Sequence, residues 1–166
     1  MDMKRLIVFF SGMWLMLAGC APHAPLAVPA SPAEIASTVK ASDAPLTLVH
    51  VWATWCPPCR VEFPELIRVH RKFSREGLNL ILISADEPGD AEQVGEFLVQ
   101  QACPVDSLIT TELSQRFIEQ FSPNWGGALP ASFFYVDGAL RAEWEGMRSF
   151  KQYANTIREL MGGDEK

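Results

Sequence analysis

The chain has 166 residues, of which 48% are hydrophobic and 20% charged, which suits one domain with a substantial core and argues against disorder. Its net charge is −6 and no run of Lys or Arg occurs, which argues against nucleic acid as a partner. The four cysteines are too few and too unevenly spaced for a disulfide scaffold: Cys20, Cys56, Cys59 and Cys103.

The first twenty residues have the organisation of an export signal. A basic pair at residues 4–5 precedes an apolar run, residues 6–17, which at about a dozen residues is shorter than the roughly 20 that span a membrane. Leu-Ala-Gly-Cys at residues 17–20 looks like a bacterial lipobox, whose cysteine receives a diacylglycerol. We therefore expect residues 1–19 to be a lipoprotein signal peptide and Cys20 to be lipidated. An ordinary signal peptide with a coincidental cysteine and an uncleaved anchor are the alternatives.

Residues 20–32 are rich in Ala and Pro. Proline fixes φ and removes a backbone donor, so we expect an extended tether that joins the lipid to a domain of residues 33–166. By resemblance to enterobacterial lipoproteins, Ala21 favours the outer membrane over the inner one. The predicted location is the bacterial cell envelope on its periplasmic side, where disulfides persist.

The domain alternates apolar strands with amphipathic helices. Its first strand is almost continuously apolar, as expected for burial on both faces of a central sheet. An Asp-Gly turn joins the last two strands, so the sequence predicts a three-layer α/β sandwich with a central mixed sheet. The expected strands are residues 46–53, 78–84, 105–109, 132–136 and 139–144. The expected helices are residues 31–40 with Ser31 as cap, the helix after the cysteines with a kink at Pro64, 90–101, 112–121 with Leu113 facing inward, and 149–161 with Ser149 as cap.

The stretch around the cysteine pair resembles a known family. Residues 51–59 read Val-Trp-Ala-Thr-Trp-Cys-Pro-Pro-Cys, which looks like the thioredoxin superfamily. Glu-Phe-Pro at 62–64, the extra helix and strand within 90–109, and Gly-Ala-Leu-Pro at 127–130 resemble its TlpA/ResA-like extracytoplasmic branch. The resemblance covers roughly residues 32–161. It implies a thioredoxin-like three-layer sandwich with an extra β-α insertion.

The two cysteines of this stretch are candidates for redox catalysis. A cysteine attacks as the thiolate, and the start of a helix favours negative charge, so Cys56 is the expected nucleophile. Cys59 lies one turn further and is expected to resolve the mixed disulfide, so the pair should cycle through a Cys56–Cys59 disulfide. Half a zinc site is the alternative, but no second Cys pair exists, and His50 and His70 show no ligand-like spacing. We expect neither a metal nor a cofactor.

Two ionisable residues lie close to the pair in the sequence. Glu62 follows Cys59 by three residues on the same helix face, and the resemblance implies that it carries the proton that Cys59 must lose. The alternative is an exposed helix glutamate. Many thioredoxins keep a buried acid six residues before the first cysteine, where this chain has His50. That histidine is either neutral and packed or a base.

The resemblance also implies a substrate site opposite the cysteines. Pro130 should form a cis peptide with Leu129 and face the disulfide, and the backbone before it pairs with a substrate strand in this superfamily. Trp55, Leu129 and Pro130 are thus the expected substrate-binding residues. Ala131 stands where the family often has Thr or Glu. Trp125 either lines this groove or packs in the core.

Two further residues have two interpretations each. Cys103 precedes Pro104 and is either a small buried hydrophobe or a third redox thiol. Arg60 either stabilises a thiolate or is a solvated helix residue.

Together these features predict a membrane-anchored thiol–disulfide oxidoreductase that reduces protein disulfides in the envelope. The resemblance implies disulfide-containing protein substrates and a membrane thiol-electron donor of the DsbD/CcdA kind, while the lipidated Cys20 would hold the chain on the bilayer. The alternatives are a copper metallochaperone or thiol-binding module that uses the same cysteine pair, and a disulfide-forming oxidant.

Overall fold

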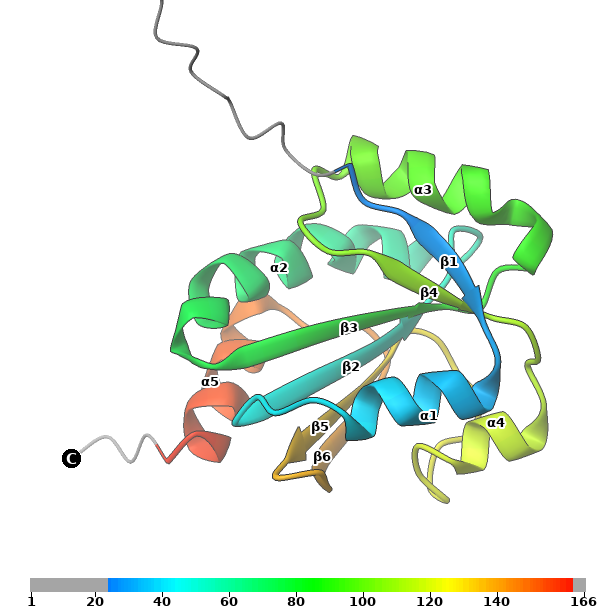
Figure 1. Cartoon of the computed structure of the whole chain (residues 1–166). Coiled ribbons are helices and arrows are strands. Elements are labelled where there is room, and N and C mark those ends of the chain that lie inside the picture. Colours follow the sequence, from blue (N-terminus) through cyan, green and yellow to red (C-terminus); the bar gives the residue numbers. More distant parts are fainter. Residues whose placement is uncertain (1–23, 163–166) are drawn as a thin grey trace, which may run out of the picture.

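The computed structural model describes residues 24–162 as one six-stranded sheet with helices on both faces. The strand order is β1-β4-β3-β2-β5-β6; β1, β4, β3 and β2 pair in parallel, and β5 pairs antiparallel with β2 and β6 (Figure 1). The strands are β1 (Ala27–Ala30), β2 (Leu46–Trp52), β3 (Leu78–Ser84), β4 (Ser107–Thr110), β5 (Ala131–Val136) and β6 (Ala139–Glu145). The helices are α1 (Pro32–Lys40), α2 (Pro57–Phe73), η1 (Ser74–Glu76), η2 (Pro88–Asp90), α3 (Ala91–Gln100), α4 (Gln115–Glu119) and α5 (Phe150–Leu160).

The buried strand β2 separates two apolar clusters. Leu48 and Trp52 lie on one face with residues of α2, α3 and α5, whereas Val49 and Val51 lie on the other face with residues of α1 and α4. This alternation follows from the two-residue period of a strand. Figure 1 shows the resulting three layers, which confirm the predicted sandwich with its central mixed sheet.

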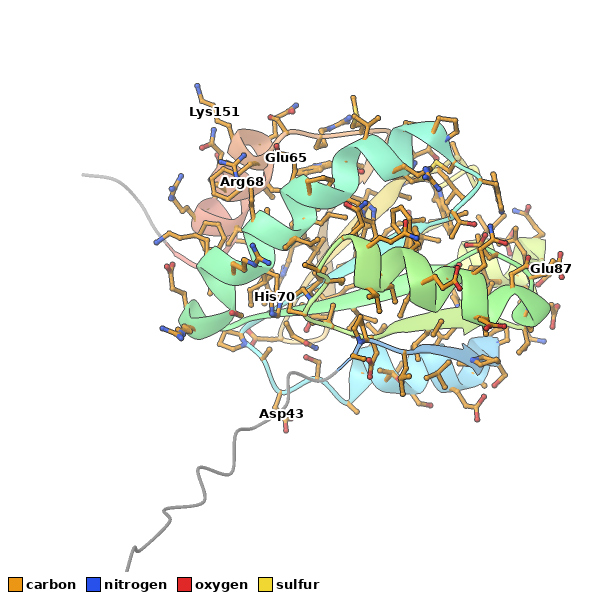
Figure 2. The ribbon with its side chains drawn as sticks, turned by 90° about the horizontal axis from the view of Figure 1, so that it is seen from above. Asp43, Glu65, Arg68, His70, Glu87 and Lys151 are labelled. Atoms are coloured by element: carbon orange, nitrogen blue, oxygen red, sulfur yellow. A yellow bond between two sulfur atoms is a disulfide. The ribbon has the colours of Figure 1, made fainter. Side chains whose placement is uncertain are left out.

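Backbone N–H groups at the start of α5 attach it to α2. Arg148 N donates to Glu62 Oε1 at 2.8 Å, and Phe150 N donates to Glu65 Oε2 at 3.1 Å. Figure 2 shows Glu65 and Arg68 together on α2 beside α5, where Arg68 forms an ion pair with Glu65 at 2.9 Å. The unpaired N–H groups of a helix start favour such carboxylates. These contacts fix the segment that passes over Glu62.

Serine caps begin the first and last helices, as predicted. Ser31 and Ser149 each accept a backbone N–H with the side-chain oxygen, and Glu34 and Gln152 complete capping boxes. Such a cap stabilises a protein by about 1 kcal/mol. Helix α2 continues without a break through Pro64.

The predicted tether is wrong at its C-terminal end, because β1 is part of the sheet. Ser107 N donates to Leu26 O at 2.9 Å, and Thr111 N donates to Ala30 O at 3.0 Å. Residues 26 and 30 therefore face β4, so Pro29 points its nitrogen to the open edge, where its missing N–H costs no ladder bond. The predicted signal peptide and Cys20 lie outside the described residues. Within residues 24–162, no helix is both long and apolar enough to cross a membrane.

The helix expected at residues 112–121 is much shorter in the structure. Ser114 is the actual cap, and its side chain accepts from Phe117 N at 3.2 Å, so α4 begins only at Gln115. Before it, Thr110 Oγ1 donates to Glu112 O at 2.9 Å and so holds the chain in a turn. Leu113 therefore precedes the helix and is 55% exposed, which corrects its predicted inward position.

Candidate functional site

The cysteine pair lies where the buried strand β2 passes into α2. Cys56 is the N-cap of α2 and is joined to Cys59 by a disulfide with an S–S distance of 2.05 Å. Cys59 N donates to Cys56 Sγ at 3.3 Å. Pro57 and Pro58 occupy the exposed first turn, where a missing N–H leaves no helix bond unmade. Cys56 is 4% exposed and Cys59 is fully buried, so an incoming thiolate reaches Cys56 first.

A buried carboxylate holds the loop that leads to Cys56. Thr54 N donates to Asp86 Oδ2 at 2.9 Å, and the Thr54 hydroxyl donates to Asp86 Oδ1. The Ser84 hydroxyl also donates to Asp86, which is only 3% exposed. An acid two residues after a buried strand is the only local signal of this contact, and the sequence alone does not predict it. Asp86 therefore positions the approach to the disulfide without reacting itself.

The peptide between Leu129 and Pro130 is cis. Ala131 starts β5 opposite Val51 of β2, which brings Pro130 to the end of the sheet that carries the cysteine loop. Pro130 O accepts from Gly146 N at 2.7 Å, so β6 holds this turn. Leu129 is half-buried and Trp55 is 62% exposed. An exposed tryptophan next to the reachable sulfur gives a partner an apolar contact.

Glu62 lies under this surface and is only 1% exposed, which contradicts the exposed-helix interpretation. Its Oε1 accepts from Arg148 N at 2.8 Å and from the Tyr153 hydroxyl at 2.9 Å. Burial raises the pKa of Glu62 to about 7, although both hydrogen bonds and the charge of Arg148 lower it. Glu62 is three residues after Cys59 in α2, so the two side chains share a helix face.

His50 faces Glu62 from β2 and is fully buried. Its Nδ1 lies 2.9 Å from the Ser132 hydroxyl, and its Nε2 lies 3.7 Å from Glu62 Oε2. Burial lowers the pKa of His50 to about 3, so the imidazole is neutral at physiological pH. The Ser132 hydroxyl is also 2.7 Å from the Tyr153 hydroxyl, whose pKa is raised by burial and by Glu62.

Sequence reasoning missed Ser132 and Tyr153. Ser132 precedes two phenylalanines in a buried strand, and Tyr153 occurs among apolar residues of α5, so each looks like an ordinary core position. A polar hydroxyl at a buried position is the one signal that could have identified them, because buried polar groups need partners.

The contacts of Arg60 and Trp125 decide between the two interpretations of each residue. Arg60 donates to Thr54 O at 3.2 Å and lies over the Phe97 ring, with its guanidinium carbon 5.1 Å from the centroid. Trp125 is 4% exposed and packs against Phe133 at 5.2 Å between ring centroids, which is a core position.

Cys103 is a free buried thiol whose Sγ donates to Val105 O at 3.3 Å, and burial raises its pKa. It is therefore the small buried hydrophobe of the first interpretation. In the described part of the chain, no three His, Cys, Asp or Glu side chains converge as a metal site.

The chain has relatives among known proteins. Residues 25–142 match the AhpC/TSA family. The thiol:disulfide interchange protein HelX of Rhodobacter capsulatus is 32% identical over 99 residues, which are 60% of this chain and 50% of that protein. The thiol-disulfide oxidoreductase ResA of Bacillus anthracis is 26% identical over 113 residues, 68% of this chain and 61% of that protein. The chain thus spans only about half to three-fifths of these relatives.

Solved structures share the fold at low identity. A thioredoxin family protein from Chlorobium tepidum aligns with a TM-score of 0.62 at 22% identity, over 76% of this chain and 85% of that one. A thioredoxin-related protein from Neisseria meningitidis aligns with a TM-score of 0.63 at 23% identity, over 74% of this chain and 90% of that one. The family match covers most of the described domain, so the chain belongs to the AhpC/TSA family and has a thioredoxin-like fold.

Proposed function

We propose that the chain is a thiol–disulfide oxidoreductase that works through the Cys56–Cys59 pair. The observation that carries this proposal is a disulfide at the start of α2 whose first cysteine keeps 4% exposure, whereas the second is fully buried. The names of the two relatives, a thiol:disulfide interchange protein and a thiol-disulfide oxidoreductase, support it.

The proposed reaction transfers two electrons from the reduced pair to a substrate disulfide. The Cys56 thiolate attacks one substrate sulfur, the substrate S–S bond breaks, and the other substrate sulfur leaves as a thiolate. Cys59 then loses its proton to Glu62, and its thiolate attacks Cys56 Sγ. The mixed disulfide breaks, the second substrate thiolate leaves, and the Cys56–Cys59 bond forms.

The start of α2 favours the first step. Cys56 Sγ already accepts the Cys59 N–H at 3.3 Å, and the positive end of the helix dipole stabilises a thiolate at this position. Thiols in such sites have pKa values of roughly 3.5–7.5 instead of about 8.5. Cys56 is thus the proposed nucleophile.

Glu62 is the proposed proton acceptor of the second step. Its carboxyl is buried on the same helix face as Cys59, and a pKa of about 7 lets it accept a proton near neutral pH and release it afterwards. Trp55, Leu129 and Pro130 are the proposed substrate contacts, because they lie at the same end of the sheet as Cys56, the more accessible of the two cysteines.

For the location, we propose the bacterial envelope, with Cys20 lipidated and the domain on the periplasmic side, preferably at the outer membrane. The export signal and lipobox in the sequence support this location. We propose that the chain reduces disulfides in protein substrates and receives electrons from a membrane thiol donor of the DsbD/CcdA kind. Labelling cells with radioactive palmitate tests the anchor: label should enter the wild type and be lost in Cys20→Ala.

Insulin reduction with dithiothreitol tests the activity. Cys56→Ser should lose catalysis, and Cys103→Ala is the matched control, because it removes a buried thiol outside the pair and should keep activity. If Cys56→Ser is as active as the wild type, the proposal is wrong. Cys59→Ala should trap substrates as mixed disulfides on Cys56.

The reduction potential tests the direction. A value near roughly −270 mV supports a reductant, whereas a value near roughly −120 mV would show a disulfide-forming oxidant.

A further inference from the structure

Four buried side chains from four different elements form a nearly closed polar circuit inside the domain. His50 of β2 lies 2.9 Å from Ser132 of β5, and Ser132 lies 2.7 Å from Tyr153 of α5. Tyr153 donates to Glu62 of α2 at 2.9 Å. The last gap, from Glu62 Oε2 back to His50 Nε2, is 3.7 Å, which is longer than a hydrogen bond. We call these four residues the His50–Glu62 circuit.

The two atoms at this gap are both buried and both lack a hydrogen-bond partner. A buried polar atom without a partner costs free energy, so each is the natural partner of the other. Glu62 Oε1 already accepts two donors, the Arg148 N–H and the Tyr153 hydroxyl. An added proton on Glu62 therefore belongs on Oε2, directed at His50.

Counting donors gives one arrangement of the circuit for protonated Glu62. Oε2–H donates to His50 Nε2, so the imidazole proton is on Nδ1 and is donated to Ser132. Ser132 then donates to Tyr153, and Tyr153 donates to Glu62 Oε1. Every side-chain donor in the circuit is used.

Ionised Glu62 requires the other tautomer. Oε2 now needs a donor, which only a proton on His50 Nε2 supplies from within the circuit. The Ser132 hydroxyl turns to donate to the bare Nδ1, while Tyr153 still donates to Oε1. Tyr153 also lies 3.5 Å from Nδ1, but its one proton is already given to Glu62. The ionised arrangement leaves no proton between the Ser132 and Tyr153 oxygens, so their 2.7 Å separation lengthens while the 3.7 Å gap closes.

We infer that His50 changes between its two neutral tautomers as Glu62 gains or loses a proton, and that this exchange lets a buried carboxyl serve as a reversible proton acceptor. His50 is thus a positioning residue that acts through Glu62. The role in catalysis rests on the proposed function: the Cys59 S–H bond breaks and its proton enters the circuit at Glu62 Oε1, from which Tyr153 takes it up while passing its own proton to Ser132. Ser132 passes its own proton to His50 Nδ1, and His50 gives its Nε2 proton to Glu62 Oε2, so one S–H bond is lost and one O–H bond is gained on Glu62.

Few other ionisable groups in the described part of the chain face His50 and Glu62. They are Tyr153 from α5, Arg148 from the β6–α5 connection and Cys59 from α2, which is held in the disulfide. Arg148 lowers the pKa of Glu62, and burial opposes it. In the oxidised protein, a titration near neutral pH at this site therefore reports Glu62.

The test is nuclear magnetic resonance of the oxidised protein, labelled with ¹⁵N-histidine and ¹³C-glutamate, between pH 5 and 9. We expect the Glu62 carboxyl to titrate near pH 7. The His50 nitrogens should change from the Nδ1–H to the Nε2–H pattern with the same midpoint, without the doubly protonated pattern. His70, which lies near the far end of α2, is the internal control and should not follow that midpoint.

The Glu62→Gln variant provides a second check. Its amide would donate to Nε2 at every pH, so His50 should stay in the Nδ1–H form throughout. A single His50 tautomer from pH 5 to 9 in the wild type, or a doubly protonated His50 in that range, would overturn the inference. This readout needs no activity: a tautomer change without trapping by Cys59→Ala would refute the proposed function alone, and trapping with a fixed tautomer would refute the circuit alone.

Discussion

Replacing Glu62 by glutamine should change how the stability of the oxidised protein depends on pH. Glu62 has its pKa raised from 4.5 to about 7 on folding, so between these values the folded state holds a proton that the unfolded state has lost. This side chain therefore contributes less stability as the pH rises from 4.5 to 7, and the loss is complete above that range. At about 1.4 kcal/mol per pKa unit, the loss is about 3 kcal/mol.

Glutamine has the same shape as protonated glutamate and does not ionise. The free energy of unfolding of Glu62→Gln, relative to the wild type, should therefore increase by about 3 kcal/mol between pH 4.5 and pH 8.5. Taking the difference from the wild type removes the titrations that both proteins share. Urea denaturation followed by tryptophan fluorescence at four pH values measures it.

Glu65→Gln is the matched control, because it makes the same chemical change one turn along α2 at a partly exposed carboxylate that also accepts a backbone N–H. The increase should be confined to Glu62→Gln. A difference between Glu62→Gln and the wild type that stays constant with pH would show that Glu62 titrates normally, and the reasoning from its burial would fail.

Three further changes test contacts that stabilise the fold around the site. Asp86→Ala should lower the free energy of unfolding by about 2 kcal/mol in urea, because three buried donors lose their acceptor; no change would show that Asp86 does not hold the loop. Ser149→Ala should cost about 1 kcal/mol, seen as a lower Tm, and retention of the wild-type Tm would refute the cap. A chain starting at Ser31 should lose about 1–2 kcal/mol relative to one starting at residue 24; equal Tm values by circular dichroism would mean that β1 adds nothing.

The sequence predicts the elements whose signals are local. Strand β2 is almost continuously apolar, and the turn at Asp137 and Gly138 has φ values of 49° and 74°, the left-handed pair that an Asp-Gly hairpin requires. Strand β1 was missed because its proline content is typical of a linker. Nothing within four residues shows that Pro29 points its nitrogen to an open sheet edge; that depends on β4, about eighty residues away.

The features of the site also fall into two groups, those that a local motif predicts and those that depend on distant elements. The cysteine pair and the cis peptide at Pro130 follow from short motifs in the sequence. The burial of Glu62 does not, because it depends on α5 and its preceding segment folding over α2. His50, Ser132 and Tyr153 meet only because three distant elements converge, and no spacing within one element reveals that contact.

The inclusion of β1 in the sheet also limits how far the catalytic domain can reach. With the anchor proposed at Cys20, only about seven residues join the lipid to Ala27, and at roughly 3.5 Å per residue they span at most about 25 Å. A linker ending at residue 32 would have allowed about 40 Å. An anchor at Cys20 would thus restrict the domain to a thin layer next to the bilayer, which would raise its effective concentration towards partners in the same membrane and favour them over freely diffusing proteins.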